Sequence, residues 1–391
     1  MPASEKRHAL VIGAGLAGAA VCAALARRGW RLTLLDAAAG PAQGASALPV
    51  GMLSAHVTRA PTPLSRLSAL GVDTTLAELQ RLVPQGQGWR ACEVDNLGHD
   101  PGRRPAALVR PAALVQAWLQ EAARLSAMET MWQAQVHALA RHGSLWQALD
   151  TDGLHLAEAP VVVVASAFGS LALLVEHSAL TGPASLPLRP VKGQMSLAAL
   201  RSEPLAARPQ RNQGVYVPLY EDTGLPPHWP ARLWATGSTY ERGRHDVAVS
   251  AVAHDSNAAS LNAMCPPAAR QLREAMADGT LLGWAQVRCA SLDRLPLVGA
   301  APDCEALRSL MEPPRRMRMP LAATPRLTGL HLLTALGSRG ITLAHWCATR
   351  LAASLDGEPA RQDEADLLAA IDPARFAWKH ARRRPPAAAR A

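Results

Sequence analysis

The stretch that decides the fold is ALVIGAGLAGAAVCAALARRGWRLTLLD, residues 9–36. An apolar run ends at Gly13, where a GxGxxG pattern begins, and an alanine-rich segment with helical spacing follows as far as Gly29. A second apolar run then ends on Asp36. This order predicts a strand, a glycine-rich turn, a helix and a second parallel strand, the arrangement that binds the pyrophosphate of a dinucleotide.

Each part of this stretch has a physical role. Gly13 permits the tight turn, Gly15 lets the backbone approach a pyrophosphate, and Gly18 lets the helix pack closely on the strand. The helix N-terminus offers free N–H groups and the positive end of its dipole to the phosphates. Asp36 stands where an acid binds an unphosphorylated ribose, so the pattern favours FAD or NAD over NADP.

Composition describes an ordinary folded protein. The 391 residues suggest two or three domains, and 49% hydrophobic against 18% charged residues excludes a disordered chain. No apolar run is long enough to span a bilayer, and the first apolar run enters the nucleotide motif, so we expect neither a membrane span nor a signal peptide. Six cysteines without a CxxC pair predict reduced, mostly buried thiols in a cytoplasmic protein, and the histidine spacing predicts no metal site.

The formal net charge of +9 favours a polyanionic partner such as RNA. The alternative is a compositional bias of the whole chain. The segments 313–320 and 379–391 hold much of the excess charge, so the charge alone leaves the partner open.

Three later segments decide between the dinucleotides. A small-residue loop, Gly44-Ala45-Ser46, is followed by Gly51-Met52; the pattern R-x-x-S-x-D-x-x-P-x-V-G spans residues 288–299; and a glycine-rich turn spans residues 337–342. Together with the opening stretch, and in this order, they resemble the D-amino-acid oxidase-like family of FAD-dependent amine oxidoreductases. The resemblance extends over residues 9–359.

A closer resemblance is to the oxidase domain of the bifunctional enzymes that complete methylaminomethyluridine at the tRNA wobble position. It is carried by GASALPVGMLSAHVT (residues 44–58), LPLRPVKGQMS (186–196), ATGSTYERG (235–243) and VRCASLDRLPLVGAAPD (287–303), among other segments. A methyltransferase domain precedes the oxidase in those proteins. The present chain begins almost at the first strand, so we expect a stand-alone oxidase, with any methyltransferase a separate protein.

The resemblance implies an α/β fold: a Rossmann-like FAD-binding domain of the glutathione-reductase or D-amino-acid-oxidase type, with a mostly antiparallel α+β substrate domain. We assign residues 1–85, 150–185 and 326–391 to the discontinuous FAD-binding domain. Residues 86–149 and 186–325 are assigned to the substrate domain. Within the first, residues 160–168 read as a central parallel strand because the run is continuously apolar.

The resemblance implies non-covalent FAD, because Cys289 does not match the positions at which some relatives attach the flavin. The residues expected to bind the cofactor are Gly13, Gly15, Leu16, Ala17, Gly18, Asp36, Gly44, Ala45, Ser46, Gly51, Met52, Val136, Ala165, Gly337, Ser338, Arg339, Gly340, Ile341 and Thr342.

The expected reaction is oxidation of an amine by hydride transfer to the flavin, so no catalytic residue is expected beyond the flavin itself. The resemblance implies that Arg288 binds a substrate carboxylate, because it begins the segment that carries the carboxylate-binding arginine in those oxidases. A fork-shaped guanidinium can hold a carboxylate bidentately; the alternative is a surface salt bridge to Asp293 or elsewhere. Tyr216 is a second substrate candidate, or else a residue of the strand core. Arg339 and Tyr240 are the other two candidate substrate-binding residues. Lys192 is weaker, the alternative being a solvated turn residue.

Three functions remain open at this point. The first is oxidation of the glycine moiety of carboxymethylaminomethyluridine in tRNA, giving aminomethyluridine and glyoxylate. The second is an oxidase or dehydrogenase of free glycine, sarcosine or a D-amino acid. The third is a non-catalytic flavoprotein. It is considered because Leu48-Pro49 interrupts the small-residue loop, and this change could have disabled turnover.

Overall fold

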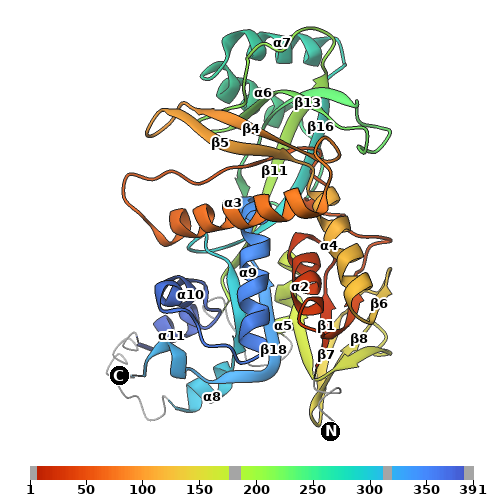
Figure 1. The fold of residues 1–391 in the computed structure, drawn as a ribbon, viewed down its shortest axis with the longest axis vertical. Helices are drawn as coiled ribbons and strands as arrows, with labels where there is room; N and C mark the ends of the chain where they lie inside the picture. Colours follow the sequence, from red (N-terminus) through yellow and green to blue (C-terminus); the bar gives the residue numbers. More distant parts are fainter. Residues whose placement is uncertain (1–6, 176–185, 311–318, 383–391) are drawn as a thin grey trace, which may run out of the picture.

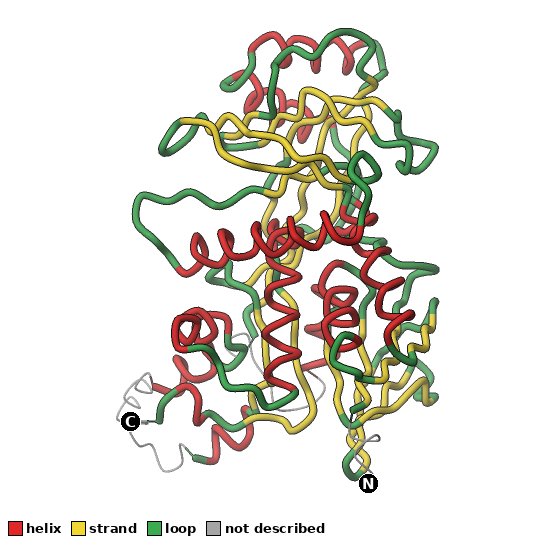
Figure 2. Tube along the Cα trace, in the orientation of Figure 1, coloured by secondary structure: helices red, strands yellow, loops and turns green. Residues whose placement is uncertain are grey.

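A computed structural model describes residues 7–175, 186–310 and 319–382 (Figure 1). The two arginine-rich segments that raise the net charge lie largely outside these residues. Two large sheets lie one beyond the other along the long axis of the molecule (Figure 2).

The first sheet has six strands in the order β17-β18-β10-β1-β2-β6. Neighbouring strands pair in parallel except β17 and β18, which pair antiparallel. The carboxyl ends of the parallel strands meet at one edge, where open α/β sheets bind ligands. The strands are β1 His8–Ile12, β2 Arg31–Leu35, β6 Met128–Met131, β10 Val161–Val164, β17 Leu297–Pro302 and β18 Arg326–Thr334.

The second sheet has nine strands, in the order β15-β11-β14-β13-β12-β4-β5-β3 with β16 paired to β11. Its strands are β3 Gly51–Leu53, β4 Trp89–Asn96, β5 Gly102–Val109, β11 Leu188–Ala199, β12 Gln210–Arg211, β13 Val215–Glu221, β14 Arg232–Gly237, β15 Glu241–Arg242 and β16 Leu282–Ser291. Only β12 and β4 pair in parallel. A third, small sheet contains β7 Ala138–His142, β8 Leu145–Leu149 and β9 His155–Ala159.

The helices fall into groups around these sheets (Figure 1). Helices α2, α4 and α9 lie against the six-stranded sheet, α3 crosses between the two sheets, and α6 and α7 lie at the far end of the nine-stranded sheet. Their bounds are α2 Leu16–Ala26, α3 Pro63–Leu82, α4 Pro111–Leu125, α5 Ser170–Val175, α6 Ala251–Asn262, α7 Pro266–Ala277, α8 Cys304–Ser309, α9 Gly340–Leu355, α10 Ala365–Ile371 and α11 Arg375–Arg382.

Strand β1 is buried on both faces, as its continuous apolar sequence predicts. Ala9 and Val11 pack with α2, α4 and α9 on one face. Leu10 and Ile12 pack on the other, where the small sheet covers them. This half of the molecule is therefore three layers deep, and the strand that leads into the glycine-rich turn lies at its centre.

The fold class predicted from the sequence is confirmed. Strand β10 lies between β18 and β1, so the run at residues 160–168 contains the central parallel strand. The domain boundaries stay a prediction. Strands β6 and β17 fall within the residues assigned to the substrate domain, yet they pair in the six-stranded sheet. All six cysteines are free, and all except Cys92 are buried.

The last described helix, α11, is joined by an ion pair to the turn between β16 and β17. Arg375 of α11 is almost fully buried and donates to both carboxylate oxygens of Asp293, at 2.8 and 2.9 Å. Burial acts to raise the pKa of Asp293, but the Arg375 guanidinium more than offsets it and leaves that pKa below its ordinary value. Asp293 is therefore the partner of Arg375 and not of Arg288.

We expect Asp293→Asn to lower the free energy of unfolding at pH 7 by about 2–3 kcal/mol, because Arg375 loses its buried counterion. The lowered pKa means that this stabilisation is present above the ordinary carboxyl range and is lost as pH falls through the lower, folded-state value. Urea unfolding across pH should show the difference from wild type shrink in acid. Asp363→Asn, in an exposed pair with Arg361, is the control and should change stability little. An equal stability for Asp293→Asn and wild type at pH 7 contradicts the assignment.

Candidate functional site

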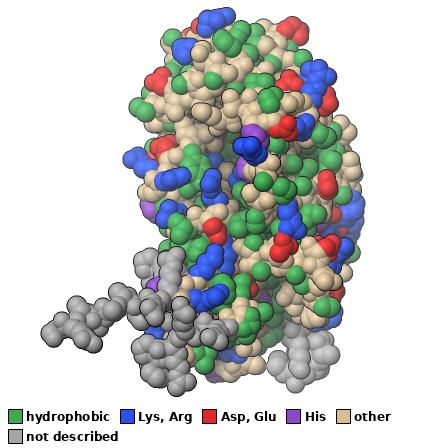
Figure 3. Space-filling model, turned by 90° about the vertical axis from the view of Figure 1, so that its left-hand side faces the viewer, with side chains coloured by type: hydrophobic (Ala, Val, Ile, Leu, Met, Phe, Trp, Pro, Cys, Tyr) green, Lys and Arg blue, Asp and Glu red, His purple; other side chains and the backbone are tan. Residues whose placement is uncertain are grey.

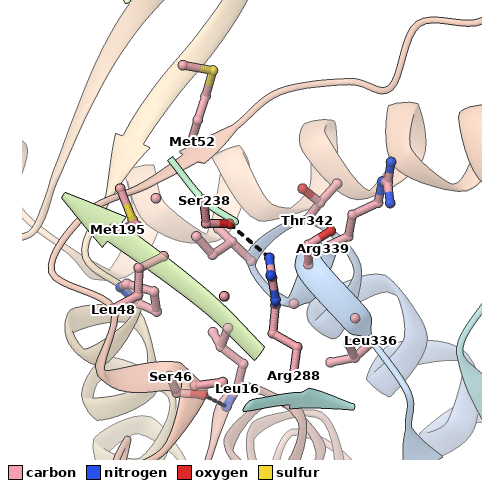
Figure 4. A pocket seen from close by; sticks show the side chains of 18 of the residues that line it. Leu16, Ser46, Leu48, Met52, Met195, Ser238, Arg288, Leu336, Arg339 and Thr342 are labelled. Carbon is pink, nitrogen blue, oxygen red and sulfur yellow. Dashed lines mark hydrogen bonds between the residues drawn. The ribbon is translucent and has the colours of Figure 1, made fainter. Parts of the chain in front are cut away.

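A pocket of about 590 Å³ lies where the two large sheets meet. Its walls come from the N-terminal ends of α2 and α9, the loop after β2, and strands β3, β11, β13 and β16. In Figure 4 Leu16 and Ser46 lie on one side of Arg288, while Ser238 lies at its guanidinium. The pocket therefore joins the glycine-rich turn to residues more than 200 positions away in the chain.

The turn before α2 has the geometry that the glycine pattern predicts. Gly13 has φ +109°, which favours glycine, and a Cβ on Gly18 would lie 1.7 Å from the Gly13 carbonyl oxygen. The N-cap of α2 is Gly15, which has no side chain to cap the helix. Instead the Leu16 N–H donates to Ser46 Oγ at 3.0 Å, so the small-residue loop lies directly against the helix end.

Asp36 closes this turn from the end of β2. Its carboxylate accepts hydrogen bonds from the backbone N–H groups of Ala14, at 2.6 Å, and Ala38, at 2.8 Å. These bonds hold the acid next to the glycine-rich turn, partly exposed. That is the position an acid needs to reach a ribose hydroxyl.

A second helix N-terminus opens on the same pocket. The 3₁₀ turn Gly337–Arg339 leads into α9, and its N-cap residue Arg339 makes no capping hydrogen bond. Gly340, Ile341 and Thr342 line the pocket, and the first N–H groups of a helix have no partner within the helix. A negative charge placed there gains about 0.3–2 kcal/mol from the helix dipole.

Arg288 carries a positive charge that no acidic side chain of the described residues neutralises. Its guanidinium donates to Ser238 Oγ at 3.0 Å and to the carbonyl oxygens of Thr239, at 2.7 Å, and Lys192, at 3.3 Å. Burial lowers its pKa below the ordinary arginine value. Gly193 leaves room for it, because a Cβ there would lie 2.1 Å from Arg288 Nη2. The surroundings hold the side chain in place and leave its charge for a ligand.

Tyr240 and Arg339 lie near Arg288. The Arg288 guanidinium carbon lies 5.3 Å from the centre of the Tyr240 ring, a cation–π distance. Arg339 contacts His56 Nδ1 at 3.3 Å, and burial followed by the charge of Arg294 lowers its pKa. Both side chains line the pocket.

The structure brings most of the predicted site residues to this one pocket. Those that line it are Gly15, Leu16, Ala17, Ala45, Ser46, Gly51, Met52, Ala165, Tyr240, Arg288, Gly337, Ser338, Arg339, Gly340, Ile341 and Thr342. Gly13 and Gly18 shape the turn beneath it, Asp36 lies at the end of β2, and Gly44 precedes the loop that does line it. Val136 packs against the core cluster on the small-sheet side of the six-stranded sheet.

Two predicted substrate residues lie elsewhere. Tyr216 is buried in a hydrophobic cluster with α6 and α7, while its neighbours Val215 and Val217 line the pocket. Successive side chains of a strand point to opposite faces, so Tyr216 is a strand core residue, the alternative left open above. Lys192 is not a solvated turn residue. It is buried in β11, and its Nζ lies 2.5 Å from Asp246 Oδ1.

The sequence patterns missed several residues that line the pocket. Met195 and Ser238 belong to segments that carry the resemblance, which could have indicated them, and Trp284 lies three residues before another such segment. Arg211 belongs to no motif, and nothing in its sequence neighbourhood indicates a site. Among the described residues that line the pocket, the charged ones are Arg211, Arg288 and Arg339, and none is Asp or Glu.

Comparison with protein families agrees with this geometry. The family model described as FAD dependent oxidoreductase matches residues 8–108 and 103–354. The chain belongs to the FAD-dependent oxidoreductase family. It is therefore an oxidoreductase that uses FAD, and the prediction of NAD as an alternative at the glycine-rich turn is set aside.

Two bacterial relatives share most of this chain. It is 36% identical over 402 residues to the tRNA 5-methylaminomethyl-2-thiouridine biosynthesis bifunctional protein MnmC of Paracidovorax citrulli, covering 90% of this chain and 58% of that protein. It is also 36% identical over 410 residues to the protein of the same name from Verminephrobacter eiseniae, covering 90% and 61%. The chain thus spans less than two thirds of the length of these relatives.

Solved structures show the same fold. Glycine oxidase from Geobacillus kaustophilus has a TM-score of 0.66 at 18% identity, with 92% of this chain and 98% of that one covered. Iminodiacetate oxidase from Chelativorans sp. BNC1 has a TM-score of 0.67 at 18% identity, with the same coverage. At this identity the likeness describes the architecture and not the substrate.

The residues present fit FAD. The α2 N-terminus with Ser46 suits a pyrophosphate, and the uncapped α9 N-terminus suits the negative charge of a reduced flavin ring. Within the described ranges no helix is long and apolar enough to cross a membrane. In the same ranges no three His, Cys, Asp or Glu side chains are grouped to hold a metal ion, and the expectation of no metal stays a prediction.

Proposed function

We propose that the chain oxidises the glycine moiety of carboxymethylaminomethyluridine at the tRNA wobble position, giving aminomethyluridine and glyoxylate. The observation that carries the proposal is Arg288. Its guanidinium lines the FAD pocket, is held by neutral oxygen atoms, and has no carboxylate partner among the described residues. A substrate that brings its own carboxylate to this point satisfies it.

The relatives' name supports RNA as the carrier of that carboxylate. A glycine moiety attached to uridine presents a carboxylate, a CH₂ group and an amine in sequence. Holding the carboxylate on Arg288 fixes the distance of the CH₂ group from the flavin side of the pocket, and such positioning is worth several kcal/mol of barrier. When bound, FAD accepts the hydride from that carbon, and hydrolysis of the resulting C=N bond releases glyoxylate.

The pocket supplies binding and orientation more than acid–base chemistry. No Asp, Glu, His or Lys is among the described lining residues. Cys289 lines the pocket, but burial raises the pKa of its thiol to about 11. The described lining side chains therefore offer no base at neutral pH.

The proposal is tested with purified protein and tRNA that carries carboxymethylaminomethyluridine. Mass spectrometry of the digested nucleosides should show aminomethyluridine, with glyoxylate in solution. An unchanged nucleoside together with hydrogen peroxide release from free glycine or sarcosine would establish the free amino acid oxidase instead. Failure of every amine to reduce the flavin would establish the non-catalytic flavoprotein.

We further propose that FAD binds without a covalent bond. The raised pKa keeps the Cys289 thiol protonated, and a thiolate is the form that attacks. We expect acid precipitation of the purified protein to leave all of the flavin in the supernatant. Flavin fluorescence that stays with the protein band on a denaturing gel contradicts this.

The remaining partners follow from the proposed substrate. A tRNA-modifying reaction places the protein in the cytoplasm, and a methyltransferase acting on the aminomethyl product is the expected next enzyme. Whether that enzyme is a separate protein can be tested by adding S-adenosylmethionine to the assay, since a methylated product would require a methyltransferase in the preparation.

A further inference from the structure

Three arginines line the pocket, and the proposed function uses one of them. Elsewhere, buried arginines of this chain contact carboxylates, as Arg110 does with Asp222 and Arg375 with Asp293. Within the described residues Arg211, Arg288 and Arg339 contact no carboxylate at all. The three side chains are partly buried. Leaving partly buried positive charge unpaired costs free energy, so we expect a ligand to pair with them.

Two of the three guanidinium nitrogens of Arg211 donate hydrogen bonds to other parts of the protein. Its Nε donates to Asn96 Oδ1 at 3.0 Å, and its Nη1 donates to Ser54 Oγ at 2.8 Å and to the Ala55 carbonyl at 2.7 Å. Its Nη2 is buried and has no hydrogen-bond partner in the part of the chain that the structure describes. Buried donors are nearly always satisfied in folded proteins, which makes this atom a candidate contact for something that binds.

Arg211 belongs to a basic cluster. The loop that it holds, Ser54-Ala55, continues into His56, whose Nδ1 contacts Arg339 on the other side. Burial, and then the charges of Arg339, Arg211 and Arg294, lower the pKa of His56. We call Arg211, His56, Arg294 and Arg339 the basic cluster. Its members come from four separate segments of the chain, so the fold and not a local motif assembles it.

The cluster borders the same pocket as the two anion sites already described, but it uses other side chains. The FAD pyrophosphate belongs at the α2 N-terminus with Ser46, and the substrate carboxylate belongs on Arg288. Arg294 is exposed, and within the described ranges its side chain makes no hydrogen bond or ion pair. The cluster thus extends from the pocket lining to the surface. Figure 3 shows Lys and Arg side chains along the face that it draws, with His side chains among them near its centre.

We propose that the basic cluster binds a phosphodiester of the RNA next to the target nucleotide while the modified base lies in the pocket. The inference rests on the proposed function. A base that enters a pocket keeps its ribose and phosphate at the rim. Arg211 and Arg339 line one pocket, and a guanidinium fork suits the two free oxygens of a phosphodiester, because it donates in parallel.

The test compares two substrates that differ in phosphate. One is an anticodon stem-loop RNA carrying carboxymethylaminomethyluridine, and the other is the same modified nucleoside alone. In Arg294→Gln, whose native side chain has no partner to lose, we expect kcat/KM for the RNA to fall about tenfold more than for the nucleoside. The slope of log(kcat/KM) against log salt should become shallower by about 0.7–0.9 for the contact removed.

Arg211→Gln tests the same cluster through binding. Its affinity for the unmodified stem-loop, measured by fluorescence anisotropy, should fall about tenfold while the FAD content of the purified protein stays at the wild-type level. Arg273→Gln on α7, an exposed arginine at the far end of the molecule, removes the same charge and should change neither property. The binding measurement needs no turnover, so it tests the cluster even if the proposed reaction fails.

Three outcomes overturn the proposal. If Arg294→Gln lowers kcat/KM by the same factor for the RNA and for the nucleoside, the cluster acts on the nucleoside and not on an RNA phosphate. Loss of FAD from Arg211→Gln would assign it to the cofactor. Unchanged RNA affinity and salt slope in both variants would show that the cluster binds no phosphate. If the wild-type protein binds RNA through the cluster but oxidises neither substrate, the proposed reaction is wrong. The proposal that the cluster binds RNA phosphate is then still supported.

Discussion

Arg288→Gln is expected to lower kcat/KM for the modified RNA by about 100- to 1,000-fold. The Arg288 guanidinium lies beside Ser238 and Tyr240 in the pocket and has no carboxylate partner among the described residues. In the variant, the substrate carboxylate would meet the neutral amide of glutamine in place of this positive charge. Both the affinity for the substrate and the position of its CH₂ group depend on this contact. Steady-state kinetics at saturating and limiting RNA should therefore show a higher KM and a lower kcat.

Gly193→Ala serves as a second variant for the same contact. It keeps the arginine, but the new Cβ would lie 2.1 Å from Arg288 Nη2 and displaces the guanidinium. We expect a smaller loss of kcat/KM than in Arg288→Gln, of about tenfold or more. Arg273→Gln again controls for the loss of one positive charge. If Arg288→Gln binds FAD fully and has the kcat and KM of wild type, Arg288 does not bind the substrate.

Gly18→Ala is expected to yield protein that retains no FAD. The added Cβ would lie 1.7 Å from the Gly13 carbonyl oxygen and 2.9 Å from the Gly13 carbonyl carbon, both backbone atoms that no rotamer change can move. Helix α2 would have to shift away from β1, which carries its N-terminus away from Ser46 and from the pyrophosphate. The ratio of flavin to protein absorbance after purification measures the effect.

Gly40→Ala is the matched control. Gly40 lies in the loop after β2, has an ordinary φ, and has nothing within 4 Å of its would-be Cβ, so the variant should bind FAD as wild type does. If most of the Gly18→Ala protein is insoluble, the flavin content of its soluble fraction is compared with that of Gly40→Ala. A lower content in Gly18→Ala still shows the loss of FAD binding. A soluble Gly18→Ala protein with full flavin content would contradict the packing argument.

The sequence predicted best those features that depend on neighbouring residues. Gly13, Gly15 and Gly18 require a particular local backbone, so strand β1, helix α2 and the turn between them follow from a short pattern. Helix α4 begins at Pro111, which suits the first turn of a helix, and its amphipathic spacing lets it bury one face. The glycine turn at residues 337–342 likewise opens α9 and lines the pocket.

Features that depend on distant contacts were harder to predict. Tyr216 was a substrate candidate because of its position in the chain, but whether a strand residue faces the pocket depends on which face α6 and α7 cover. Strands β6 and β17 join the six-stranded sheet through partners far away in sequence. Arg211 reaches the pocket only because β12 pairs with β4, and no local pattern records that pairing.

The most direct test of the central claim is anaerobic reduction of the bound flavin. Purified protein mixed with tRNA carrying carboxymethylaminomethyluridine should lose its visible flavin absorbance, whereas the same tRNA without the modification should leave it unchanged. Flavin that stays oxidised with the modified tRNA but is reduced by free glycine would contradict the account.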